Sequence, residues 1–385
     1  MPSPVQSHAE ERRKHLAAMQ RAVPVTRMVD YGVPLGDALH IHGLIATDDS
    51  AGWDEICERL AARHHGFAEA AEKAGRSPTA AQAWRAASAL LQCAQLAFNQ
   101  DVPRKRALYE QAHAALSRHA HLSGDLAEVQ LSTTYGALHG WIVRPESVAA
   151  TAAVIVVGGL SGWGSVYLDI GRALAARGLL AILAEGPGQG LTRLRGGMHL
   201  DDRTLPLFSA FLDHAESLGV RRCGVWGNSF GGLFAAQLAA RDRRVRALCV
   251  NGAPMIPSVP PFRTAREQME AVFGVDDGIS LGHRLQSLAM NPRRHRIDAH
   301  LLVVQGGRDA LVPLGEQTSY FTLVPAHEKA VLTWADGEHT IYNYAQERNA
   351  QAADWFAERL DPAAALIENN EGDMNWKNPQ ALNLT

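Results

Sequence analysis

The spacing of apolar residues changes near Gly124, and this change constrains the fold more than any other feature of the 385-residue chain. Before Gly124, apolar residues recur at intervals of three and four, which is one face of a helix. The clearest set is Trp84, Ala87, Leu91, Ala94 and Phe98. After Gly124, short β-branched runs alternate with helical stretches. We therefore expect an N-terminal helical cap or lid domain over residues 1–124 and an α/β domain over residues 125–360.

The α/β domain contains short apolar runs typical of strands. Val129–Thr133 and Leu138–Val143 flank Tyr135-Gly136 and predict a leading antiparallel hairpin. The later runs are typical of strands buried on both faces of a parallel sheet: Ala152–Val157, Leu179–Ala184, Arg222–Trp226, Val245–Val250, His300–Gln305 and Ala330–Trp334. Helices are expected between most of them, near Leu168–Arg177, Leu205–Leu218 and Gly231–Ala240.

Charge and composition narrow the class of function. Lys and Arg number 37 against 40 Asp and Glu, so charge gives no reason to expect nucleic acid or an anionic membrane as a partner. No apolar run reaches the roughly 18–20 residues of a membrane span, and Met1 to Gln20 lacks the apolar core of a signal peptide. Four cysteines without a CxxC pattern favour the reducing cytoplasm.

The histidines and the C-terminus carry weaker signals. His40 and His42, and the adjacent His64 and His65, have no Cys or carboxylate set at metal-ligand spacing, so we expect no metal site. Residues 361–385 are polar and Asn-rich, and we expect a mobile or partner-docked tail there.

Gly227-Asn228-Ser229-Phe230-Gly231 is a G-x-S-x-G motif between an expected strand and an expected helix. In that context the serine sits on a strained turn, and its neighbours two residues away must be small. The turn would expose the Ser229 hydroxyl above the sheet and place the Phe230 amide at a helix N-terminus, aimed at an oxyanion. This pattern predicts a nucleophilic serine.

A nucleophilic serine needs a base, and the base needs an orienting acid. Asp309 follows the expected strand His300–Gln305, and His339 follows Ala330–Trp334. Open α/β sheets place their sites at these carboxyl ends of strands. We therefore predict the triad Ser229, Asp309 and His339. Asp336 and Glu338 are rival acids, but so near His339 in sequence they are better explained as turn formers.

A second oxyanion donor should come from the loop after Ala152–Val157, which reads Gly158-Gly159-Leu160. We expect the Leu160 amide to fill this role, with Gly159 as the alternative. Trp163 and Met255 flank the predicted site and are candidate substrate contacts. In the helical domain Trp84 and Tyr109 could line an aromatic pocket, or they could be core residues.

With these residues in view, the chain resembles the α/β-hydrolase superfamily. More narrowly it resembles the branch that contains 2,6-dihydroxypseudooxynicotine hydrolase and the FrsA-like esterases. The narrower resemblance rests on Gly158-Gly159-Leu160, on the Gly186-Pro187-Gly188-Gln189-Gly190 turn, and on the Trp84…Ala94-Gln95…Phe98…Asp101 helix. Glu185 stands where family members usually have Asp, and Asn251–Met255 holds no carboxylate where the C–C hydrolase has one.

This resemblance implies a helical domain over the sheet with a small-molecule substrate between them, no cofactor, and a homodimer. It also implies hydrolysis of a carbon–carbon bond in an acyl-aryl or related ketone, or of an ester. Three alternatives remain open: a carboxylesterase or thioesterase, an acyltransferase or cyclase with the same triad, and a non-catalytic binding protein on the same fold.

Overall fold

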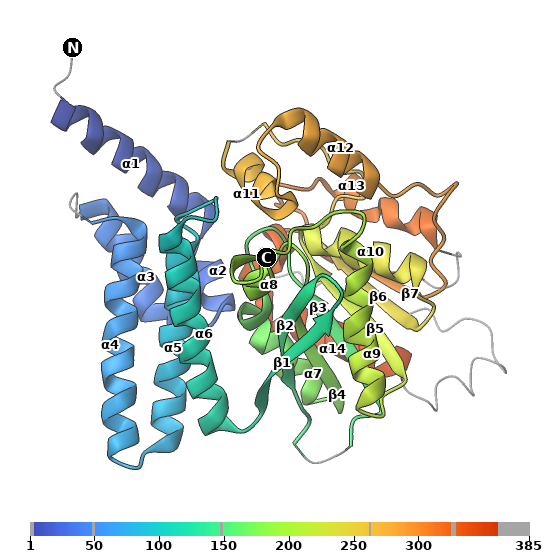
Figure 1. Ribbon diagram of the computed structural model, residues 1–385, viewed down its shortest axis with the longest axis horizontal. Coiled ribbons are helices and arrows are strands. Elements are labelled where there is room, and N and C mark those ends of the chain that lie inside the picture. Colours follow the sequence, from blue (N-terminus) through green and yellow to red (C-terminus); the bar gives the residue numbers. More distant parts are fainter. Residues whose placement is uncertain (1–3, 48–50, 147–148, 262, 325–328, 361–385) are drawn as a thin grey trace. The chain divides into compact units, whose positions relative to one another are not determined.

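The computed structural model describes residues 4–47, 51–146, 149–261, 263–324 and 329–360 (Figure 1). The chain divides into two compact units, Met1–Ala127 and Glu128–Thr385. The expected boundary after residue 124 lies close to this division. The expected C-terminal tail, residues 361–385, lies outside the described residues.

The first unit is helical, as the apolar spacing predicts. Its helices are α1 (Pro4–Ala22), α2 (Val25–Asp30), α3 (Leu35–Thr47), α4 (Trp53–Lys73), α5 (Ser77–Gln95) and α6 (Pro103–Ser123). Helix α5 packs against both α4 and α6, and almost all of it after Thr79 is buried (Figure 1). Proline begins α6, and Gly124 ends it in a left-handed conformation (φ 74°) that residues with a side chain rarely adopt.

The second unit is built on an eight-stranded sheet. Its strands are β1 (Leu126–Thr133), β2 (Gly136–Val143), β3 (Ala152–Val157), β4 (Leu179–Glu185), β5 (Arg222–Asn228), β6 (Val245–Asn251), β7 (His300–Gly306) and β8 (Lys329–Trp334). They lie in the order β1-β2-β4-β3-β5-β6-β7-β8. Strand β2 is antiparallel to β4, and β3 to β8 are parallel, so the predicted fold class is confirmed.

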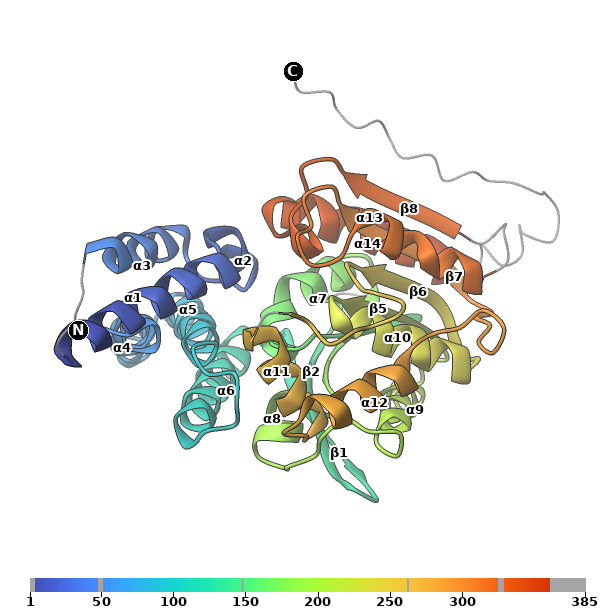
Figure 2. The same ribbon diagram turned by 90° about the horizontal axis from the view of Figure 1, so that it is seen from above.

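Helices cover both faces of this sheet, as the view from above shows (Figure 2). On one face, Ile155 and Val225 share a core with Phe234 of α10 (Phe230–Arg241) and with residues of α9 (Ser209–Ser217). Successive strand residues point to opposite faces, so Gly224 faces the other side. There Phe356 of α14 (Ala345–Leu360) lies against Gly224, and α14 packs on α7 (Leu168–Ala175).

The remaining elements lie in the connections between strands and after the last one. They are η1 (Gly164–Tyr167), α8 (Gly190–Leu194), η2 (Leu205–Phe208), α11 (Arg263–Phe273), α12 (Gly278–Leu288), α13 (Leu314–Gln317), η3 (Thr318–Leu323) and η5 (His339–Tyr344). Helices α11, α12 and α14 are not among the elements that the sequence predicts. In the described ranges, no helix combines the length and the apolar character that crossing a bilayer requires.

The four cysteines are buried free thiols, on α4, α5, β5 and β6. Burial raises the pKa of Cys93 to about 12 and that of Cys223 to about 11. Burial also raises the pKa of Cys57 and Cys249. A thiol reacts as its thiolate, so these four side chains serve as packing residues in the folded chain.

Candidate active site

Ser229 occupies a strained turn between the end of β5 and the start of α10. Its backbone has φ 53° and ψ −135°, a conformation that residues with a side chain rarely adopt. The flanking glycines make the turn possible. A Cβ on Gly227 would lie 2.3 Å from the carbonyl oxygen of Gly231, and one on Gly231 would lie 2.2 Å from that of Gly158. The motif therefore needs both glycines for steric reasons.

Three side chains form a continuous hydrogen-bonded chain at the carboxyl end of the sheet. Nε2 of His339 lies 2.8 Å from Oγ of Ser229, and Nδ1 of His339 lies 2.9 Å from Oδ2 of Asp309. They follow β5, β8 and β7, which is where the sequence predicts them. With Nδ1–H donating to Asp309, Nε2 is left to accept the hydroxyl proton of Ser229.

The Asp309 carboxylate is fully buried and is fixed on both oxygens. Oδ1 accepts the amides of Leu311 (2.8 Å) and Val312 (3.0 Å), while Oδ2 faces His339. The rival acid Asp336 instead accepts the hydroxyl of Tyr344, at 2.5 Å. Glu338 precedes His339 at the N-terminus of η5. Asp309 is thus the carboxylate that can hold the imidazole in one orientation.

The backbone after His339 is strained, since Thr340 (φ 53°) and Ile341 (φ 62°) are both left-handed. Two buried side chains hold it. The carbonyl of Thr340 accepts a bond from Arg348 at 2.7 Å and one from Nδ2 of Asn251 at 3.2 Å. The carbonyl of Asn251 also accepts the Ser229 amide at 2.7 Å. Asn251 therefore links the loop of the serine to the loop of the histidine.

The predicted oxyanion loop lies directly against the serine. A Cβ on Gly159 would lie 3.0 Å from Cβ of Ser229 and 3.3 Å from the amide nitrogen of Phe230. Phe230 is the first residue of α10, so its amide has no acceptor within the helix. Its ring packs on Phe234 and Phe273, and Leu160 packs at the margin of the same core. The structure thus brings Gly159 and Phe230 beside Ser229.

The two candidate substrate contacts near the site are largely buried. Met255 is 8% exposed and belongs to the core under α10. Trp163 is 1% exposed, and its indole N–H donates to the carbonyl of Gly159 at 3.0 Å. The guanidinium carbon of Arg193 lies 4.8 Å from the centre of the Trp163 ring. A direct contact of Trp163 or Met255 with substrate stays a prediction.

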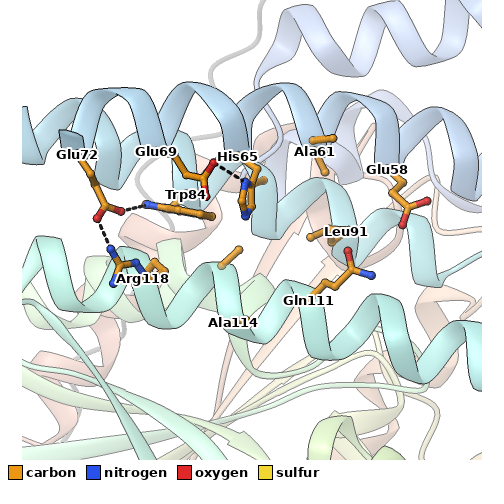
Figure 3. Close-up of a pocket in the computed structure, with 13 residues that line it drawn as sticks. Glu58, Ala61, His65, Glu69, Glu72, Trp84, Leu91, Gln111, Ala114 and Arg118 are labelled. Carbon is orange, nitrogen blue, oxygen red and sulfur yellow. Dashed lines mark hydrogen bonds and ion pairs between the residues drawn. The ribbon is translucent and has the colours of Figure 1, made fainter. Parts of the chain in front are cut away.

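The helical unit has a groove of its own, with a volume of about 610 Å³ (Figure 3). Residues of α4 and α6 line it together with Trp84, Ala87 and Leu91 of α5. Trp84 lines it and donates its indole N–H to Glu72, which also binds Arg118. The bond from Trp84 is the main cause of a lowered pKa at Glu72. Tyr109 is buried in α6 and does not line this groove.

His42 and His64 take part in contacts within the helical unit. Asp37 binds His64 and Arg63, each at 2.6 Å, and His42 contacts the carbonyl of Val23. Within the part of the chain that the structure describes, no group of three or more His, Cys, Asp or Glu side chains is arranged to hold a metal ion.

Two curated relatives are similar to part of this chain. A hydrolase from Aspergillus aculeatus, Hydrolase acrC, is 28% identical over 246 residues, which is 57% of this chain and 57% of the relative. The 2,6-dihydropseudooxynicotine hydrolase of Paenarthrobacter nicotinovorans is 25% identical over 224 residues, which is 56% of this chain and 60% of the relative. The matches thus span less than two thirds of either relative. No protein-family model matches the chain.

A solved structure extends the comparison to most of the chain. The crystal structure of the 2,6-dihydroxy-pseudo-oxynicotine hydrolase superposes with a TM-score of 0.77 at 21% identity, over 88% of this chain and 96% of that one. The chain has the α/β-hydrolase fold. Ser229 lies on the turn between β5 and α10 of this fold.

Sequence reasoning missed the residues that hold this site together. Gln189 donates its side-chain N–H to the carbonyls of Gly158 and Gly159. Asn251 and Arg348 hold the backbone after His339. A fully buried polar residue at a strand end, such as Asn251, could have been noticed from its position. Arg348 lies within an ordinary charged helix sequence and gives no such signal.

Proposed function

We propose that this chain is a serine hydrolase that transfers an acyl group from its substrate to water through an ester with Ser229. The observation that carries the proposal is the hydrogen-bonded chain from Ser229 through His339 to Asp309. Its support is geometric: the bonds are 2.8 Å and 2.9 Å, the serine backbone is strained, and the Asp309 carboxylate is buried. The curated relatives named as hydrolases support the same reaction class.

The first half of the reaction forms the acyl-enzyme. His339 accepts the Ser229 proton at Nε2 while Oγ attacks the substrate carbonyl, and Asp309 stabilises the imidazolium. The amides of Phe230 and Leu160 donate to the oxyanion. Loss of one such donor typically costs about 3–4 kcal/mol of barrier. The tetrahedral intermediate collapses, the bond to the leaving group breaks, and the leaving group takes the proton from His339.

The second half releases the acid. His339 removes a proton from water, the hydroxide adds to the acyl carbon, and the bond from that carbon to Oγ breaks. Ser229 recovers its proton from His339. This sequence uses only the chain's own residues and water.

The leaving group defines the substrate class. For an ester the departing atom is oxygen. For an acyl-aryl ketone it is a ring carbon, which keeps the bonding electron pair and takes the proton. The relative from Paenarthrobacter is named for a pseudooxynicotine compound, which supports an acylated aromatic substrate here. An ester is the second candidate substrate, and its hydrolysis uses the same acyl transfer.

The test compares the wild-type chain with Ser229→Ala on p-nitrophenyl esters of graded length and on an acylphloroglucinol ketone. Ser217→Ala is the matched control, because Ser217 is exposed on α9 and its hydroxyl bonds only a local carbonyl in the contacts described. Turnover that Ser229→Ala abolishes and Ser217→Ala keeps supports the proposal. The substrate that reacts identifies the bond that is cleaved.

Two other outcomes point elsewhere. If no substrate turns over but a fluorophosphonate labels Ser229, transfer of the acyl group to an acceptor other than water replaces hydrolysis. If the fluorophosphonate fails to label Ser229, the serine is not an activated nucleophile and the proposal is wrong.

A further inference from the structure

The carbonyl of Gly159 is held by two buried side chains from different segments. Nε1 of Trp163 donates to it at 3.0 Å, and Nε2 of Gln189 lies 3.4 Å from it. Gln189 also donates to the carbonyl of Gly158. Both consecutive carbonyls of the oxyanion loop are therefore drawn toward the same side of the loop.

This anchoring fixes the direction of the next amide. A trans peptide is planar, so the C=O of Gly159 and the N–H of Leu160 point in opposite directions. With its carbonyl bonded to Trp163 and Gln189, the peptide turns the Leu160 N–H away from them. The Cα of Gly159 lies beside Ser229 and the Phe230 amide, so Leu160 follows directly after the residue that contacts the serine.

The two anchors are themselves fixed by the turn that follows β4. Gln189 is fully buried, and its Oε1 accepts the amide of Gly186 at 3.2 Å. The Arg193 guanidinium lies over the Trp163 ring and donates to the carbonyl of Gly188 at 2.9 Å. The turn after β4 thus supports the loop after β3. Both anchors are therefore held in place, and the Leu160 amide keeps its direction.

We propose that Gln189 and Trp163 are positioning residues that orient the Gly159–Leu160 peptide for oxyanion stabilisation. This inference rests on the proposed hydrolysis. Neither side chain touches the reacting atoms in this role. Each acts through the carbonyl of Gly159, and loss of either lets the peptide rotate so that the Leu160 amide no longer faces the oxyanion.

The variants replace each anchor with an apolar side chain: Gln189→Leu removes the donor to Gly158 and Gly159 together with the acceptor for the Gly186 amide, and Trp163→Phe removes the indole N–H. Gln237→Leu is the matched control. Gln237 is also fully buried, and its amide donates to a backbone carbonyl, that of Leu288 at 2.7 Å, in a different part of the core. Far-UV circular dichroism and melting temperature show which variants fold. If Gln189→Leu does not fold, Trp163→Phe tests the same carbonyl.

The decisive readout compares an oxoester with its thionoester analogue, in which sulfur replaces the carbonyl oxygen. Sulfur is a weak hydrogen-bond acceptor, so a misplaced amide lowers the oxoester rate more than the thionoester rate. A loss of folded protein lowers both rates equally. Titration with a fluorophosphonate gives the concentration of active sites in each preparation, and the measured rates are divided by it.

We expect kcat for the oxoester to fall about 10- to 100-fold in each anchor variant. This loss is smaller than the loss of about 10²–10³-fold in kcat that follows removal of a donor. KM should stay within about twofold, and the ratio of oxoester to thionoester rates should fall. Because both anchors act on one carbonyl, the double variant should lose less than the product of the two single losses. Gln237→Leu should keep the wild-type ratio.

The inference is overturned if folded Gln189→Leu and Trp163→Phe keep the wild-type kcat, or lose both ester rates equally. Failure of the proposed function is a different result, in which the wild-type chain hydrolyses neither the esters nor the ketone. The rate at which a fluorophosphonate labels Ser229 then tests the two anchor residues, since the phosphoryl oxygen occupies the oxyanion position. Unchanged labelling of the variants, or no labelling of the wild type, overturns the inference.

Discussion

The hydroxyl oxygen of Ser229 lies 2.8 Å from Nε2 of His339, although 110 positions separate the two residues in the sequence. They meet because β5, β6, β7 and β8 are parallel neighbours, so the loops that follow these strands gather at one edge of the sheet. The contact exists only when the sheet from β5 to β8 is assembled. Activity therefore reports on long-range folding of the second unit.

Asp309→Asn tests the role of the buried carboxylate. An amide N–H in place of Oδ2 would face Nδ1 of His339 and favour the tautomer with its proton on Nε2, which cannot accept from Ser229. We expect kcat to fall about 10⁴-fold. Steady-state kinetics measures the loss, and the melting temperature checks the fold. Asp336→Asn is the control and should stay near wild type, whereas equal losses in both variants would contradict the assignment.

Gly159→Ala tests the close approach of the oxyanion loop. The added Cβ would lie 3.0 Å from Cβ of Ser229 and 3.2 Å from the carbonyl oxygen of Asn228, so the loop must shift. We expect kcat to fall about 10²-fold, comparable to loss of one oxyanion donor. Gly282→Ala on α12 is the control, because an added Cβ there meets nothing within 4 Å. That variant should keep its activity and gain about 0.5–1 kcal/mol of unfolding free energy. An active Gly159→Ala would show that the loop lies farther from Ser229.

Asn251→Asp tests the link between the serine and histidine loops. Nδ2 of Asn251 donates to Oδ1 of Asn228 at 2.9 Å and to the carbonyl of Thr340 at 3.2 Å. A buried carboxylate oxygen at that position would face two acceptors and could donate to neither unless it were protonated. We expect the unfolding free energy to fall by about 2–4 kcal/mol, together with kcat. Urea unfolding measures the first effect, and unchanged stability would mean that the bonds contribute little.

Asp242→Asn tests an ion pair through its pH dependence. The hydrogen bond from Arg244 is the main cause that lowers the pKa of Asp242. A carboxyl whose pKa is lowered by folding adds stability above its unfolded pKa, about 4, and this stability is lost as the pH falls through its folded pKa. We expect Asp242→Asn to lose about 1 kcal/mol at pH 7, because both side chains are partly exposed. The difference from wild type should shrink toward pH 3.

Asp298→Asn is the control for that measurement, since its pair with Arg296 is more exposed. It should leave the unfolding free energy unchanged at pH 7. A constant difference between Asp242→Asn and wild type across the pH range would show that the pair does not couple folding to protonation.

Apolar runs and glycine turns are local signals, so the sequence predicts the fold class and the positions of the strands along the chain. It does not predict the order of the strands in the sheet, in which β4 lies between β2 and β3. The positions of Ser229, Asp309 and His339 at strand ends followed from the same signals, while their catalytic roles stay predictions. The predicted strands were one or two residues short at the carboxyl ends of β4 to β7, because polar residues such as Asn228 and Asn251 continue them. Polar residues buried at strand ends do not resemble strand sequence.

Such local signals do not predict contacts between side chains from distant loops. The sequence places Gln189 in a tight turn, and the structure shows that its side-chain amide donates to the loop after β3. The position of Trp163 beside that loop predicts a substrate contact, but it does not predict the hydrogen bond from its indole to Gly159. Periodicity places a residue on a face or in a loop. It does not give the direction of a side chain that crosses between two loops.

The buried thiols have a practical consequence for chemical labelling. All four cysteines of the chain are enclosed, and burial raises the pKa of each. A cysteine introduced at an exposed position, such as Ser217, would therefore react with maleimides far faster than the native thiols. A fluorophore or spin label could be attached at one chosen site without first replacing the native cysteines.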